Sequence, residues 1–87
     1  MSKLEPRLFG LISDSGECAK LEIRIEPSPR YGMQISRRGT VMGVWSERDG
    51  RLGFRNLSSW QVRHWAASPE EALAITLEMA HRNDWLS

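Results

Sequence analysis

The 87-residue chain has one cysteine, two histidines and no apolar run near the ~20 residues that a membrane-spanning helix requires. A single cysteine cannot form an internal disulfide, and one cysteine with two histidines is too small a set for a structural zinc site. Residues 1–6 also lack the apolar core of a signal peptide. These absences predict a cytoplasmic protein with no membrane segment and no metal.

Residue types found in catalytic sites are present, but their spacing does not support catalysis. The glycines form neither a phosphate-binding loop nor a dinucleotide-binding fingerprint. Cys18 has no nearby base in the sequence, and His81 is explained by its place near the end of an expected helix. His64 lies between tryptophans, where it either packs with them or lies at the rim of a binding surface. We therefore predict a protein that is not an enzyme and has no cofactor.

Alternating polar and apolar residues predict an antiparallel sheet built from hairpins. The clearest alternation places Leu21, Ile23 and Ile25 between charged residues, and the dipeptide Asp49-Gly50 is typical of a tight hairpin turn. We predict strands at residues 7–13, 18–26, 31–36, 40–46, 51–57 and 60–66. For the last of these, a short helix capped by Ser59 is the alternative.

The sequence Ser68-Pro69-Glu70-Glu71 is a strong helix-start signal. Ser68 suits the N-cap, Pro69 the first helical position and Glu71 the third position of a capping box. It predicts a C-terminal helix over residues 69–82. Together with the strands, this helix predicts one α+β domain over residues 1–87, in which an antiparallel sheet of five to six short strands packs against a single helix.

The apolar residues of this helix cover roughly 200° of the helical wheel, against the ~100° stripe that one sheet face requires. A second apolar neighbour is therefore expected, either Trp85 with the chain ends or another copy of the protein. Ile75, Met79 and Trp85 are the candidate self-association residues, and a homodimer is expected on this ground.

The middle of the chain is basic. Seven arginines against two carboxylates give residues 27–67 a net charge of +5, whereas residues 68–87 carry −3. Strand alternation places arginines and a tryptophan on the sheet face opposite the core. The candidate binding face comprises Arg24, Arg51, Arg55, Gln61, Arg63 and Trp65. Arg37 and Arg38 form a candidate basic turn.

Arginine and tryptophan dominate protein-binding hot spots, so the first interpretation is a protein-binding module. It would be an accessory or inhibitor protein that occludes a surface of a larger partner. The small size and the lack of enzymatic motifs resemble, in type, phage and mobile-element proteins such as anti-CRISPR inhibitors.

The alternative is a small nucleic-acid-binding domain that uses arginine for phosphate contacts and tryptophan for stacking. The expected order of three strands and a Ser-Pro-Glu-Glu-Ala helix over residues 40–82 resembles, in topology, DNA-binding domains of the AP2 type. No base-reading motif of that family matches.

Overall fold

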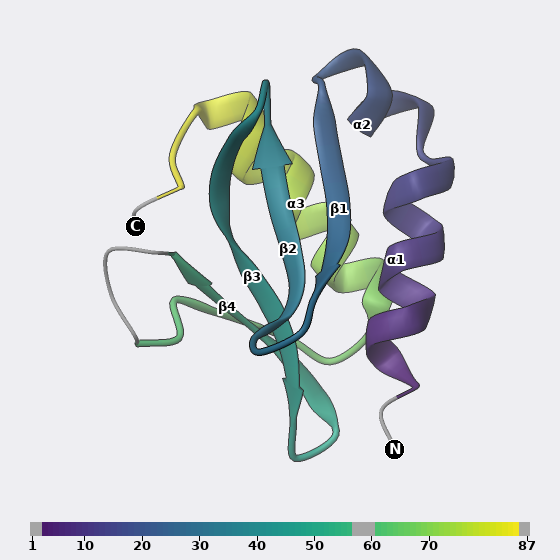
Figure 1. Ribbon diagram of the computed structural model, residues 1–87, viewed down its shortest axis with the longest axis vertical. Helices are drawn as coiled ribbons and strands as arrows, with labels where there is room; N and C mark the ends of the chain where they lie inside the picture. The colour runs from purple at the N-terminus through teal and green to yellow at the C-terminus, as the bar shows by residue number, and fades with distance from the viewer. Residues whose placement is uncertain (1–2, 57–60, 86–87) are drawn as a thin grey trace.

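The computed structural model describes residues 3–56 and 61–85, which form one antiparallel sheet with helices packed against one of its faces (Figure 1). The order of the strands across the sheet follows the order of the chain. The strands are β1 (Ile23–Ser28), β2 (Gly32–Arg37), β3 (Thr40–Arg48), β4 (Arg51–Asn56) and β5 (His64–Ala66). The helices are α1 (Leu4–Asp14), α2 (Gly16–Lys20) and α3 (Pro69–Arg82). The predicted α+β fold class, an antiparallel sheet with a C-terminal helix, is confirmed.

One face of the sheet supplies the core. Ile25 pairs with Ile35, and Trp45 pairs with Phe54, so their side chains point together toward the helices. The indole of Trp45 donates a hydrogen bond from Nε1 to Thr76 Oγ1 at 2.9 Å, and Thr76 Oγ1 donates to the Ala72 carbonyl at 2.8 Å. Thr76 is the polar side chain that fixes α3 against the central strand.

The predicted strand at residues 7–13 is wrong, because these residues belong to α1. Leu4, Leu8 and Ile12 are spaced four apart, which places them on one helical face, and Leu8 and Ile12 are buried. Pro6 falls in the first turn, where a missing backbone N–H costs no helical hydrogen bond. The chain therefore has a second long helix that packs beside α3.

The start of α1 is held by β3. The Leu4 N–H donates to Glu47 Oε1 at 3.3 Å, and the Glu47 N–H donates to Glu5 Oε2 at 2.8 Å. Each carboxylate satisfies a backbone donor of the other element, as a capping side chain does within one helix. This reciprocal pair joins the end of β3 to the helix layer.

The predicted strand at residues 18–26 is wrong in its first half. Ser15 accepts a hydrogen bond from the Cys18 N–H at 3.1 Å and so caps α2, and β1 begins only at Ile23. The strands predicted at 31–36, 40–46 and 51–57 correspond to β2, β3 and β4. The strand predicted at 60–66 is shortened to β5, and Ser59 and Trp60 lie outside the described residues.

In two of the hairpins, both residues at the centre of the turn have left-handed backbone conformations. Arg38 and Gly39 have φ of 54° and 83°, and Asp49 and Gly50 have φ of 56° and 80°. Two consecutive positive φ values are the signature of the type I′ turn, whose twist matches that of the flanking strands. The predicted Asp-Gly turn therefore lies where the sequence suggested, and Arg38 adopts the same conformation in the preceding hairpin.

Candidate functional site

The outer face of the sheet, opposite the helices, carries Trp65 and Arg51. Leu52 and Phe54 are fully buried in the core, so strand alternation turns Arg51 and Arg55 to the outer face. Trp65 lies opposite Gly53 in the neighbouring strand. The guanidinium carbon of Arg51 lies 3.9 Å from the centroid of the Trp65 ring, which is a cation–π contact.

Trp65 is held from both sides. A Cβ built on Gly53 would lie 3.1 Å from Trp65 Cζ3, so the indole rests directly against the strand at this glycine. Arg51 covers the ring in the cation–π contact, yet 36% of Trp65 remains exposed. The pair is therefore a preformed arginine–tryptophan unit and not a loose side chain.

Further arginines surround this unit. Arg48 lies directly opposite Arg51 at the end of the β3–β4 hairpin, and Arg63 is exposed two residues before Trp65. Like charges directly opposite each other across two strands are destabilising. Within the described residues, Arg48, Arg51 and Arg63 form no ion pair, and Arg7, Arg38 and Arg82 all do. We call Arg48, Arg51, Arg63 and Trp65 the basic patch.

Other residues of the predicted face lie elsewhere or have local partners. Arg24 is in β1, three strands from β4, next to Glu26 on the same strand. Arg55 Nη2 donates to Ser46 Oγ at 3.3 Å. Gln61 is exposed, at the start of the segment that leads to β5. Arg48 was not among the predicted residues of the face, although the alternation that places Arg51 on the outer face applies to it as well.

The two arginines of the predicted basic turn have different roles. Arg37 donates from Nε to the Leu21 carbonyl at 3.0 Å and from Nη1 to the Ala80 carbonyl at 3.2 Å, so it caps the ends of α2 and α3. Arg38 forms an exposed ion pair with Glu22 at 2.7 Å. Arg37 is therefore a structural residue of the helix layer, and Arg38 is neutralised at the surface.

The residues proposed for self-association face the protein's own core. Met79 and Trp85 are buried, and the Trp85 ring lies 6.4 Å from that of Phe54, centroid to centroid. Ile75 is half-buried against the same core. Since α3 packs against α1 and both Met79 and Trp85 belong to the buried core, these two residues are not available for a contact between copies.

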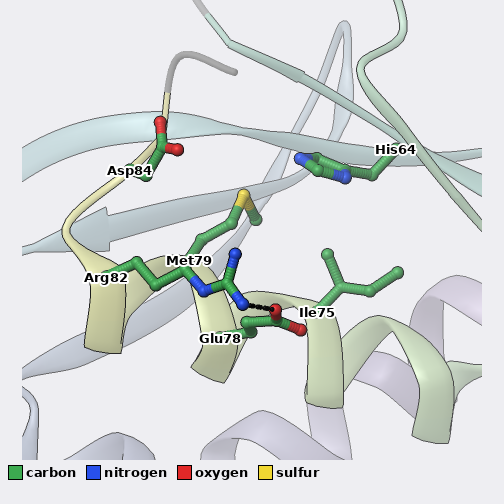
Figure 2. Close-up of a pocket in the computed structure, with 6 residues that line it drawn as sticks. All are labelled: His64, Ile75, Glu78, Met79, Arg82 and Asp84. Atoms are coloured by element: carbon green, nitrogen blue, oxygen red, sulfur yellow. Dashed lines mark ion pairs between the residues drawn. The ribbon is translucent and has the colours of Figure 1, made fainter.

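A pocket of about 240 Å³ lies between β5 and the C-terminal half of α3 (Figure 2). Ile75 and Met79 supply its apolar part. Glu78 and Arg82 also line it, and they form an ion pair with 2.9 Å between Glu78 Oε1 and Arg82 Nη2. His64 lines the pocket on the β5 side, and its Nε2 is buried with no hydrogen-bond partner in the described part of the chain. The pocket is smaller than the ~300 Å³ at which small-molecule sites begin. It suits one side chain of a partner better than a substrate.

Among residues 3–56 and 61–85, no three His, Cys, Asp or Glu residues lie close enough together to hold a metal ion. The helices within the same ranges are all too short or too polar to cross a membrane.

Cys18 is fully buried in α2, not on the polar face of a strand. Burial raises the pKa of its thiol, the neighbouring Glu17 raises it further, and the hydrogen bond with Ser15 lowers it. We expect the folded protein to react with a thiol-specific reagent at least about 100-fold more slowly than the urea-unfolded chain, because both access and thiolate are reduced. Equal rates in the two states, followed by absorbance, would show that Cys18 is accessible.

No protein-family model matches the chain, and no curated protein or solved structure shows significant similarity to it.

Proposed function

We propose that the chain is a non-enzymatic protein-binding module that uses the basic patch to occlude an acidic surface of a larger partner protein in the cytoplasm. The observation that carries the proposal is the stacked pair of Arg51 on Trp65, a preorganised contact of the two residue types most enriched in binding hot spots. Because the pair is already ordered, little side-chain entropy is lost on binding.

The charge around the pair supports an acidic partner surface. Arg48 and Arg51 repel each other across the hairpin, and a carboxylate placed between them relieves that repulsion. Arginine also binds carboxylates through two parallel hydrogen bonds, which favours one orientation of the partner. The proposed mode of action is steric occlusion, and the resemblance to small inhibitors of the phage and mobile-element type is one of size and of lacking enzymatic motifs.

Affinity capture of the partner from the cells that express the protein, followed by measurement of the Kd, tests the proposal. Trp65→Ala should weaken binding by about 2 kcal/mol, or roughly 30-fold, because it removes the centre of the hot spot. Arg7→Ala is the control, since Arg7 is an exposed arginine of α1 that pairs with Glu70, and its variant should bind within about twofold of the wild type. Equal losses in both variants, or recovery of nucleic acid without a stoichiometric protein, would reject the proposal.

Nucleic-acid binding remains the second candidate, favoured by three arginines of one patch without ion pairs among the described residues. Stacking of a base on Trp65 would first require Arg51 to leave the ring, since Gly53 lies against the indole as well. This ranks the candidate below protein binding. It predicts salt-dependent binding to duplex or single-stranded nucleic acid, which a titration at low ionic strength would detect or exclude.

A further inference from the structure

The outer edge of the sheet at β1 borders the helices α1 and α2. Among the described strands, β1 pairs with β2 alone, and its other edge faces a groove of about 230 Å³ between the strand and the helices α1 and α2. Figure 1 shows β1 as the strand nearest to α1, at the end of the sheet. The groove is lined by Ile23, Arg24, Ile25 and Glu26 from β1, and by Ile12, Ser13, Ser15 and Ala19 from the helical side.

The register identifies which backbone groups point into this groove. The Arg38 N–H donates to the Glu22 carbonyl at 3.2 Å, so these two residues form a hydrogen-bonded pair at the end of the β1–β2 ladder. Because hydrogen-bonded and non-hydrogen-bonded pairs alternate in an antiparallel ladder, the backbone groups of Ile23, Ile25 and Pro27 point away from β2. Pro27 agrees with this phase, since it has no N–H to give to β2.

Two backbone N–H groups, those of Ile23 and Ile25, therefore lie along the edge without a hydrogen-bond partner among the described residues. Both residues are nearly buried, and an unpaired N–H in such a place costs free energy. An additional antiparallel strand paired along this edge would satisfy both donors.

We propose that this strand is β1 of a second copy of the chain, paired about a two-fold axis through Ile25. In this arrangement Arg24 lies opposite the partner's Glu26, and Glu26 lies opposite the partner's Arg24. The two opposite-charge pairs lie on the outer face of the joined sheet. The edge thus carries charges that complement an identical strand at this register.

The two symmetric registers with an axis through Arg24 or Glu26 are unfavourable. An axis through Arg24 places it opposite the partner's Arg24, and an axis through Glu26 places two glutamates opposite each other. The axis through Ile25 also suits the proline: the Ile25 N–H donates to the carbonyl of the partner's Ile25, and the Ile23 N–H donates to the carbonyl of the partner's Pro27. Both free donors of each copy are then used, and none is required from Pro27.

The pairing leaves the basic patch accessible, because β4 and β5 lie at the opposite end of the sheet from β1. The dimer is therefore independent of the proposed binding function. It also replaces Ile75, Met79 and Trp85 as the basis for self-association.

Sedimentation equilibrium of the full chain, over about 1 μM to about 1 mM, tests the dimer. The wild type should shift from 10.0 kDa toward twice that mass as concentration rises. Arg24→Glu and Glu26→Arg should each weaken dimerisation by about tenfold, because both turn two attractive pairs into repulsive ones. An equimolar mixture of the two variants should form a heterodimer, and the double variant Arg24→Glu/Glu26→Arg should regain the wild-type dimer.

Arg63→Glu is the control, since it makes the same change of charge in the basic patch and should leave the dimer unchanged. Circular dichroism checks that each variant is folded, and recovery in the mixture separates lost pairing from lost folding. A wild type that stays at 10.0 kDa throughout overturns the proposal. A dimer whose affinity is unchanged by every variant at residues 24 and 26 also overturns the proposal. Protection of the Ile23 and Ile25 amides from hydrogen exchange only in the presence of another protein would assign the edge to that protein and equally overturn it.

Discussion

Replacing Gly43 by alanine should destabilise the protein by about 3 kcal/mol or more, a large part of the stability of a domain of this size. Gly43 lies in β3 beneath the ring of Phe54. A Cβ there would lie 2.5 Å from Phe54 Cζ and would also overlap the carbonyl oxygen of Arg55. The ring is fully buried and the carbonyl belongs to the neighbouring strand, so neither can move aside cheaply. Urea unfolding followed by tryptophan fluorescence measures the loss.

Gly10→Ala is the matched control for this prediction. Gly10 lies in the middle of α1, and nothing is within 4 Å of the position of its missing Cβ. Alanine should therefore stabilise the protein there by about 0.5–1 kcal/mol through its higher helix propensity. Two glycine-to-alanine changes should thus have opposite signs. Similar unfolding midpoints for the two variants would contradict the packing of Phe54 on β3.

Thr76→Val should destabilise the protein by roughly 1–3 kcal/mol although it preserves the shape of the side chain. The change removes the oxygen that accepts the hydrogen bond from Trp45 Nε1, and this leaves the indole N–H buried without that partner. Thr76→Ser retains the hydroxyl and should cost less, since it loses only a methyl group.

A double-mutant cycle with Trp45→Phe isolates this interaction. In the Trp45→Phe background the buried donor is absent, so Thr76→Val should cost about 1 kcal/mol less than in the wild type. Free energies of unfolding from urea titrations give the four corners of the cycle. Additive effects would mean that the bond between Trp45 and Thr76 contributes nothing to stability.

The alternation of polar and apolar residues predicted the sheet, but a strand predicted from the apolar residues at 7–13 proved to be part of a helix. The run Arg7–Ser13 contains apolar residues at spacings compatible with a strand, and it is too short for periodicity alone to exclude a helix. What decides the matter is Leu4 and Pro6, just before the run, which extend the four-residue spacing of Leu8 and Ile12 and mark a first helical turn. The helix layer against which α1 packs is a tertiary feature, and a local pattern cannot show it.

The candidate site was predictable where it depended on neighbouring strands. Arg51 and Trp65 could be placed on one face because β4 and β5 are consecutive in the chain. Arg24 could not be separated from them without the strand order, which puts β1 at the far edge. Arg37 illustrates the same limit, because it looks equivalent to Arg38 in sequence. In the structure Arg37 lies on the same face of β2 as Met33 and Ile35, which faces the core, and it therefore reaches the ends of α2 and α3.

The reciprocal contact between Glu47 and the start of α1 has a consequence for mechanical coupling. Glu47 immediately precedes Arg48 of the basic patch, and its backbone and carboxylate are both bonded to the first turn of the helix. A force that a partner exerts on the β3–β4 hairpin would therefore be transmitted to the first turn of α1. Because α1 packs against α3, it would also reach the contact between the two helices. Occupation of the patch should raise the resistance of the helix layer to local unfolding. The slowest-exchanging amides of α1 should then report on binding at the opposite face of the sheet.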